Sequence, residues 1–218
     1  MKHKGSQPNE ELEEFDIGED ETEEEIDQFP EPSISVVDGQ FRNSKVYIAD
    51  HPSACSIHDQ SFFGNFTSDK QLELDLMEAL ILQERKRIHI YDEQHHEMSF
   101  ENIIAFAAKS DDRIWTKYLI YRDLRQRGYV VRMGFGDGMD FRVFPRGAQH
   151  QEDVAKYFIC ILPEGDPVQL ETLDKITKQS IMARKELLLA IIDRLGDPTY
   201  YKLEQFKLTP NDKVKGAW

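Results

Sequence analysis

The spacing of apolar and polar positions in the first third of the chain predicts short strands followed by a loop. Apolar, mostly β-branched runs at 36–37 and 46–48 indicate two strands. Asp38–Gly39 is a typical turn pair and is expected to separate them. A polar stretch with Gly64 follows and is expected to be a loop that leads to residue 72.

The next stretch changes from strand to helix at a predicted cap. Residues 72–74 alternate as in a strand, and Asp75 with Glu78 three positions later fits the capping box that begins many helices. Apolar side chains then recur at helical spacing, at Leu76, Met77, Leu80 and Ile81. Another strand is predicted at 88–91, and Ser99 is a candidate N-cap for a second helix.

The second half of the chain has the predicted order helix, three strands, helix, two strands. A polar break at Ser110–Asp112 precedes a helix at 115–127, and Gly128 suits the left-handed conformation that closes helices. The GFGDG segment between the first two strands lacks the Lys and Ser/Thr of a phosphate-binding loop and is predicted to be a hairpin turn. With a second helix at about 170–183, this order predicts a mixed sheet flanked by helices.

These elements predict an α/β (α+β) fold with two domains. A small N-terminal α/β domain is expected at 34–109 and a mixed-sheet C-terminal domain at 110–208. Residues 1–33 are expected to form a disordered acidic tail, because many like charges with few apolar residues cannot offset the entropy of ordering. Residues 209–218 are assigned to a C-terminal tail.

Composition narrows the class of protein. The hydrophobic content of 39% is sufficient to fill a core. No run approaches the ~20 apolar residues of a membrane span, and the N-terminus has no secretory signal, so we expect a soluble cytoplasmic protein with no membrane partner. Two cysteines, Cys55 and Cys160, are too few for a disulfide framework or a four-cysteine zinc site.

The net charge of −14 is concentrated at one end of the chain. Residues 1–34 carry 13 acidic side chains against two lysines, a net charge of −11, which leaves only −3 for the other 184 residues. The acidity therefore does not exclude a nucleic-acid partner for the folded part. The tail is interpreted either as a solubility segment or as an arm that binds a partner or mimics RNA.

The densest basic segment spans residues 113–132 and contains one acidic residue, Asp123. Aromatic residues are interleaved with its arginines, an arrangement that can follow a phosphate backbone and stack bases. The alternative is a solvated helix face whose aromatic residues belong to the core. The candidate RNA-binding residues are Arg122, Arg125, Arg127 and Arg132.

Other candidate sites are weak. The DEQHHE run at 92–97 invites a metal site, but adjacent histidines point apart, so an exposed polar loop is predicted. Asp140 can begin a metal-dependent nuclease motif, but Lys156 lacks the acid two residues before it. No serine-hydrolase motif and no activated cysteine is present.

Several segments together resemble the archaeal tRNA-splicing endonucleases over about residues 36–208. They are LELDLMEALIL, YLIYRDLRQRGYVV, GDGMDFRVFPRG, AKYFICIL, ARKELLLAIID and GDPTYYKLEQF, in order and at matching spacing. The resemblance implies an N-terminal α/β domain and a C-terminal domain similar to restriction endonucleases. It also implies metal-free cleavage of precursor tRNA at bulge-helix-bulge introns, without a cofactor, to leave 2′,3′-cyclic phosphate and 5′-hydroxyl ends.

The family uses Tyr, His and Lys for this reaction, and the resemblance places Phe144, Val154 and Lys185 at those positions. Phenylalanine and valine have no ionisable group, so the base and the acid are missing and Lys185 is interpreted as vestigial. His150 lies four residues before Val154 and is the alternative acid. The chain is therefore expected to be inactive alone.

Two functions follow from this resemblance. In the first, the chain is a structural, pseudo-catalytic subunit that pairs with a catalytic homologous subunit, in a heterotetramer, or associates with itself, to act on precursor tRNA. In the second, it is a non-catalytic RNA-binding or protein-binding module outside splicing. The first is favoured because the segments that resemble the family's subunit contacts are present: Asp193 and Asp197 in an acidic turn, and Tyr200 and Tyr201 in a terminal strand.

Overall fold

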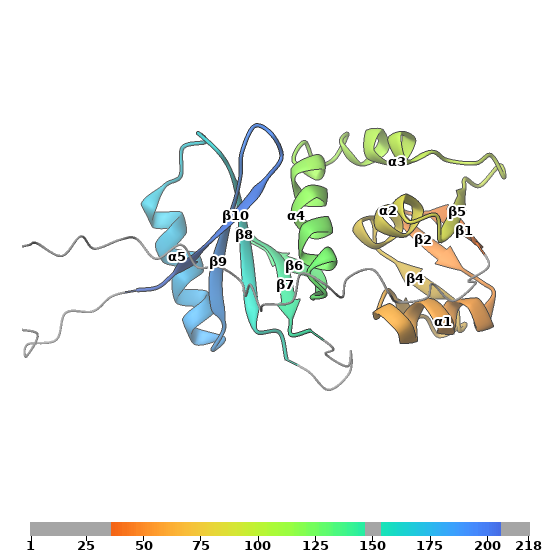
Figure 1. The fold of residues 1–218 in the computed structure, drawn as a ribbon, viewed down its shortest axis with the longest axis horizontal. Helices are drawn as coiled ribbons and strands as arrows, with labels where there is room; N and C mark the ends of the chain where they lie inside the picture. Colours follow the sequence, from red (N-terminus) through yellow and green to blue (C-terminus); the bar gives the residue numbers. More distant parts are fainter. Residues whose placement is uncertain (1–35, 147–153, 206–218) are drawn as a thin grey trace, which may run out of the picture.

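The computed structural model describes residues 36–146 and 154–205. Within these ranges the chain forms two five-stranded sheets and five helices (Figure 1). The predicted tails at 1–33 and 209–218, and His150, lie outside the described residues. No helix in the described part of the chain is long and apolar enough to cross a membrane.

The N-terminal sheet is mixed and carries its helices on one face. Its strands lie in the order β3 (Asn65–Phe66), β4 (Leu72–Leu74), β2 (Lys45–Ile48), β1 (Val37–Arg42) and β5 (Ile88–Tyr91). Only β1 and β5 among these neighbours run parallel. The helices are α1 (His51–Ser61), α2 (Leu76–Glu84) and α3 (Phe100–Ala107). The predicted capping box of Asp75 and Glu78 begins α2, and Ser99 caps α3, which confirms both signals.

Helix α1 replaces part of the predicted loop, so that prediction is wrong. Asp50 caps the helix by accepting a hydrogen bond from the backbone N–H of Ser53 at 3.2 Å, and Pro52 lies in the first turn, where proline is tolerated. Only Ala54 and Ile57 of α1 are buried. The helix therefore lacks the apolar spacing by which helices are recognised in a sequence.

Strand β1 runs straight through the predicted turn at Asp38–Gly39, which is a second correction. The turn to β2 lies at Asn43–Ser44, where both residues have positive φ, as hairpin turns require. Gly39 is needed for a different reason. A Cβ atom on Gly39 would lie 2.6 Å from Cγ1 of Val46, so the core side of β1 has no room for a side chain there.

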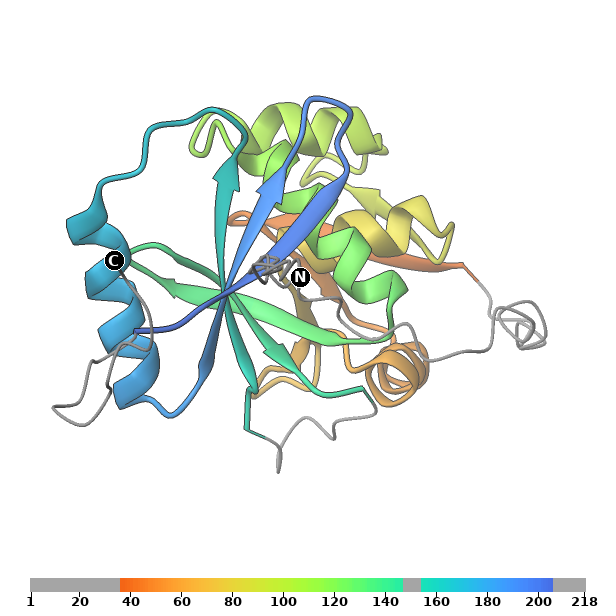
Figure 2. The ribbon, with the colours of Figure 1, turned by 60° about the vertical axis from the view of Figure 1, so that its left-hand side comes forward.

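The C-terminal sheet has the predicted order of elements and lies between two helices. Its strands are arranged as β10 (Pro198–Leu203), β9 (Glu186–Ile192), β8 (Tyr157–Pro163), β7 (Met139–Phe144) and β6 (Val130–Gly136). Strands β8 and β9 are parallel and the other neighbours antiparallel. Helices α4 (Ile114–Gln126) and α5 (Leu170–Met182) cover opposite faces (Figure 2). Gly128 has φ +84°, as predicted, and GFGDG forms the hairpin between β6 and β7.

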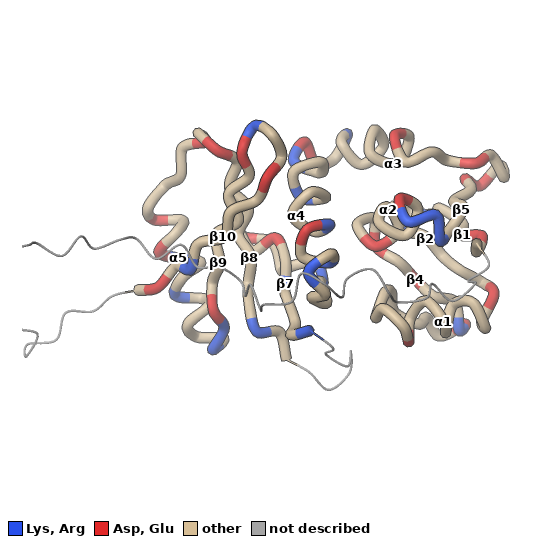
Figure 3. The backbone as a smooth tube through the Cα atoms, in the orientation of Figure 1, with Lys and Arg blue, Asp and Glu red and all other residues tan. Residues whose placement is uncertain are grey.

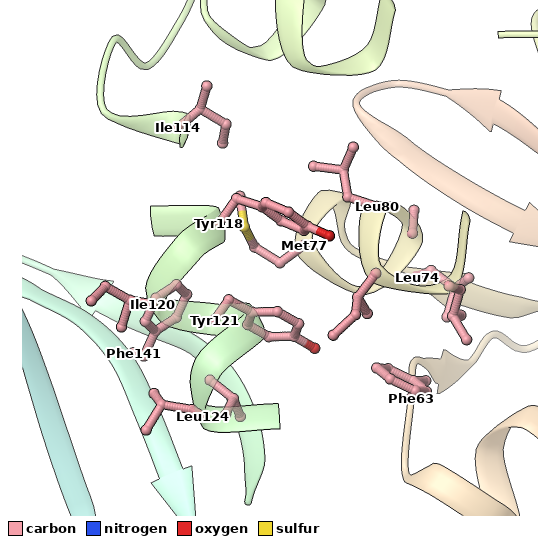
Figure 4. Close-up of a cluster of buried hydrophobic side chains, with 14 of the residues drawn as sticks. Phe63, Leu74, Met77, Leu80, Ile114, Tyr118, Ile120, Tyr121, Leu124 and Phe141 are labelled. Atoms are coloured by element: carbon pink, nitrogen blue, oxygen red, sulfur yellow. The ribbon is translucent and has the colours of Figure 1, made fainter. Parts of the chain in front are cut away.

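One hydrophobic cluster continues through both domains (Figure 4). Helix α4 carries it, because Tyr121 packs against Phe141 of β7 while Tyr118 lies beside Met77 of α2. Six of the nine residues of α2 are buried, since the helix contacts the N-terminal sheet on one side and α3 and α4 on the other. The two domains therefore share their core.

A buried ion pair links the domains at the start of α2. One Glu78 oxygen completes the capping box by accepting from the N–H of Asp75 at 2.9 Å. Its other oxygen accepts from the N–H of Gly64 at 2.9 Å and from the guanidinium of Arg132 on β6. Arg132 also donates to the carbonyls of Phe62, at 2.8 Å, and Gly64, at 3.1 Å. A residue of the C-terminal sheet thus binds the cap of an N-terminal helix.

Arg125 of α4 holds the same segment from a second side. Its guanidinium donates to the carbonyl of Ser61 at 2.6 Å and lies 3.9 Å from the centre of the Phe63 ring. The carbonyls at the end of α1 have no partner within the helix, so a cation there is favourable. We call Glu78, Arg125, Arg132 and residues 61–64 the domain clamp.

Replacing Glu78 with Gln tests the domain clamp. Glutamine keeps the size of the side chain but leaves the buried Arg132 without a counter-charge, and removal of one partner of a buried ion pair typically costs about 3–5 kcal/mol. Because burial raises the pKa of Glu78 to about 8, we expect E78Q to lower the free energy of unfolding by that amount in urea denaturation at about pH 9, where the carboxyl is ionised. The double variant Glu78→Gln/Arg132→Met carries no unpaired buried charge and should be more stable than E78Q. A loss below about 1 kcal/mol for E78Q, the size typical of surface pairs, would contradict this account.

Candidate functional site

The three positions that sequence analysis singles out line one pocket. Phe144, Val154 and Lys185 surround a cavity of about 410 Å³. Phe135, Phe158 and Arg142 of the C-terminal sheet contribute to the same wall, together with Arg132 and with Asn65 from the N-terminal domain. Arg132 therefore belongs both to the domain clamp and to the wall of this pocket.

Strand topology brings these three positions together. Phe144 ends β7, Val154 lies three residues before the start of β8 at Tyr157, and Lys185 directly precedes β9. Because β7 is antiparallel to β8 while β8 is parallel to β9, the end of β7 and the beginnings of β8 and β9 share one edge of the sheet. Residues that are distant in sequence thus meet at that edge.

The pocket is electropositive. Three cations line it, and no carboxylate is among the described residues that form its wall. Arg132 is neutralised by Glu78, whereas no described carboxylate forms an ion pair with Arg142 or Lys185. Arg142 donates to the carbonyl of Met133 at 3.0 Å and lies 4.6 Å from the centre of the Phe135 ring. Burial lowers the pKa of the Arg142 guanidinium, and the charge of Arg132 lowers it further. Such a wall favours an anion.

The described wall of the pocket has no group that can carry a proton to or from a substrate at neutral pH. The side chains of Phe144 and Val154 contain only carbon and hydrogen, so they cannot exchange a proton. Val154 is 67% exposed and lies at the mouth of the pocket. No Asp, Glu, His, Cys or Tyr side chain is among the described lining residues. The arrangement can bind a phosphate group, but it lacks the pair that general acid–base catalysis needs.

The structure separates the four candidate RNA-binding arginines into two groups. Arg125 and Arg132 belong to the domain clamp, where their guanidinium groups bind carbonyls and Glu78, so an RNA phosphate competes with these contacts. The sequence does not reveal this, because nothing in it shows that a second domain covers that side of α4. Arg122 pairs with Glu84 at 3.3 Å and Arg127 with Asp123 at 3.0 Å, so acidic and basic residues alternate along this surface (Figure 3).

Of the candidate subunit-contact residues, Asp193 and Tyr200 make contacts within the chain, whereas Asp197 and Tyr201 are exposed. Asp193 accepts hydrogen bonds from the N–H groups of Leu195, at 2.8 Å, and Asp197, at 2.9 Å, and these bonds lower its pKa. Its carboxylate therefore shapes the turn between β9 and β10, while Leu195 at the tip is 87% exposed. Tyr200 is buried and donates to Asp123 at 2.6 Å, whereas Tyr201 is 40% exposed on strand β10 at the sheet edge.

The weaker candidates have structural roles. The DEQHHE run forms an exposed turn between β5 and α3, in which Asp92 accepts from the N–H groups of Gln94 and His96. In the described part of the chain, no three His, Cys, Asp or Glu residues gather where they can hold a metal ion. Asp140 is buried and accepts from Arg113 at 3.1 Å and from the N–H of Ile161 at 2.8 Å, so it fixes the start of α4 to the sheet.

Comparison with known proteins covers both domains. The family model described as tRNA intron endonuclease, N-terminal domain, matches residues 37–104, and that described as tRNA intron endonuclease, catalytic C-terminal domain, matches residues 114–200. The tRNA-splicing endonuclease of Thermococcus kodakarensis is 32% identical over 163 residues, 75% of this chain and 94% of that protein. That of Thermococcus onnurineus is 33% identical over 151 residues, 69% and 85% respectively. That of Methanothermobacter thermautotrophicus is 32% identical over 168 residues, 77% and 96%.

Proposed function

We propose that this chain, which belongs to the tRNA intron endonuclease family, is a structural subunit of a tRNA-splicing endonuclease. A homologous catalytic subunit cleaves precursor tRNA at bulge-helix-bulge introns to give 2′,3′-cyclic phosphate and 5′-hydroxyl ends. The observation that carries this proposal is the pocket in which Phe144 and Val154 lie beside Lys185. The described wall of the pocket holds Lys185 and two arginines but neither an acid nor a base.

The size of the expected defect follows from the reaction. Attack of a 2′-hydroxyl on the phosphate needs a base for its proton, and departure of the 5′-oxygen needs an acid. Each positioned acid or base typically contributes about 10²–10⁴ in rate. Lys185 can stabilise the charged transition state, but it cannot replace both proton transfers. A chain that lacks both groups is expected to be inactive by itself.

Exposed elements at one edge of the C-terminal domain support a role in assembly. The turn between β9 and β10 presents Asp197 and Leu195 to solvent, and β10 leaves one side of its backbone unpaired in the described sheet. An unpaired edge strand is a ready template for pairing with another chain. We propose that the partner is a catalytic homologue or a second copy of this chain, and that Tyr201 lies in the contact.

The second candidate function is RNA binding outside splicing. The electropositive pocket, with Arg142 and Lys185 unpaired by described carboxylates, supports it. On α4, Arg122 and Arg127 are further candidates for phosphate contacts. To bind a phosphate, Arg122 has to release Glu84 and Arg127 has to release Asp123. Dependence of splicing activity on this chain separates the two functions.

Cleavage assays test the proposed function directly. The purified chain should not cut a bulge-helix-bulge RNA, with or without EDTA, because two proton-transfer groups are missing. Addition of the catalytic homologue from the same genome should give metal-independent cleavage that neither chain achieves alone. Robust cleavage by the pure chain would contradict the proposal and would assign the acid to His150. If the partner is fully active without this chain, the second function is favoured.

Charge changes in the β9–β10 turn test the contact with the partner. Because Asp193 shapes the turn, Asp193→Asn removes its charge but keeps an oxygen that accepts both backbone hydrogen bonds. Asp197→Lys reverses an exposed charge. If the turn lies in a basic cleft, the double variant should shift the complex to smaller species in size-exclusion chromatography, with the larger share of the effect from Asp197→Lys. An unchanged elution volume would exclude a charge-based contact here.

A further inference from the structure

A second pocket lies far from the site described above, on the outer face of the N-terminal sheet. Its volume is about 430 Å³. Its lining includes Gln40 and Arg42 of β1, Tyr47 of β2, Tyr91 of β5, Gln71 and His95. Alternate residues of the same strands point into the core, where the helices pack. The polar face of this sheet therefore carries the pocket.

Strand register arranges two tyrosines on either side of one amide. Gln40 is paired with Tyr47 across the antiparallel β1–β2 contact and with Tyr91 across the parallel β1–β5 contact. The three side chains form one row over three neighbouring strands. Since neighbouring strands are about 4.8 Å apart, the two tyrosines are about 10 Å apart at the backbone. Two tyrosine positions thus flank Gln40, whose amide can both donate and accept hydrogen bonds.

Neighbouring contacts hold Tyr47 in place. The Tyr47 hydroxyl donates to Glu73 at 3.0 Å, and the guanidinium of Arg42 lies 4.8 Å from the centre of the Tyr47 ring. Arg42 also donates to the side-chain oxygen of Gln71 at 3.3 Å, which leaves the NH₂ group of Gln71 available as a donor. Tyr47 is therefore fixed before any ligand arrives, so little conformational entropy is lost on binding.

The charge of the pocket favours an uncharged ligand group. Asp38 and Arg42 are the charged side chains in its described lining, and they balance each other. A phosphate gains little electrostatic binding energy in a site without net charge. A nucleobase offers a flat ring that can stack on the tyrosines and polar edges that can hydrogen-bond to the glutamine amides. In a duplex the faces of the bases are stacked on each other, so only an unpaired base can enter.

We propose that this outer face of the N-terminal sheet binds an unpaired base of RNA between Tyr47 and Tyr91, with Gln40 and Gln71 contacting the edge of the base. The choice of RNA rests on the proposed function, because the relatives of this chain are tRNA-splicing endonucleases. The N-terminal domain then contributes an RNA contact of its own, in addition to supporting the pocket of the other domain.

Paired leucine and phenylalanine variants of the full chain test this proposal. The probes are a fluorescently labelled RNA hairpin with a three-nucleotide bulge and the same hairpin without the bulge, measured by anisotropy. Tyr91→Leu and Tyr47→Leu each remove one stacking surface and should weaken binding of the bulged RNA about tenfold. Tyr91→Phe keeps the ring and should bind like the parent chain. Binding of the fully paired hairpin should not change.

Salt dependence and cross-linking identify the contact. Loss of stacking should persist as salt is raised, because stacking releases no counterions. A 4-thiouridine placed in the bulge should cross-link to the β1, β2 or β5 peptides. Equal losses for both hairpins, or leucine variants that bind as well as the parent chain, would overturn the proposal. If the leucine variants lose bulge binding although the partner enzyme cleaves without this chain, the base site stands and the splicing role fails. If splicing needs this chain but the variants are neutral, only the base site fails.

Discussion

The contact on which this structure depends is the buried pair between Glu78 and Arg132. Glu78 closes the cap of α2 and binds a cation from the other sheet with the same carboxylate. Burial of two charges is costly unless hydrogen bonds compensate for the lost water. Here backbone groups of residues 62–64 bind the Glu78 carboxylate and Nη2 of Arg132, whereas Nε of Arg132 has no partner among the described residues. The pair therefore fixes the angle between domains whose apolar cores are continuous.

The shape of the pocket depends on the domain clamp and on strand register rather than on the side chains at 144 and 154. Arg132 is part of both the domain clamp and the pocket wall. The register of β7, β8 and β9 positions Phe144 and Lys185. None of these constraints requires a proton donor or acceptor. The fold therefore does not depend on which side chains stand at 144 and 154, and function has to be argued from the site itself.

Much of this fold could be predicted from local sequence signals, because they act over short distances. Asp75 with Glu78, and Gly128 after α4, satisfy backbone groups a few residues away, so their patterns are visible in the sequence. The roles of Arg125 and Arg132 are not visible, because their partners in the domain clamp lie 54 to 70 residues earlier in the chain. The sequence predicts a turn at Gly39 for the same reason. The residue has to be glycine because the side chain of Val46 on the next strand leaves no room for a Cβ atom. The site positions came from family resemblance, and topology explains why they meet.

The most direct test of the account is restoration of the missing groups. Phe144→Tyr and Val154→His should be introduced together, and cleavage of a bulge-helix-bulge RNA measured in EDTA, in complex with a partner whose own catalytic histidine has been replaced. If the pocket has kept its geometry, the double variant should cleave with a 2′,3′-cyclic phosphate product, and a further Lys185→Met change should abolish that cleavage. No cleavage by a correctly assembled double variant, or cleavage by the parent chain at the same rate, would contradict the account.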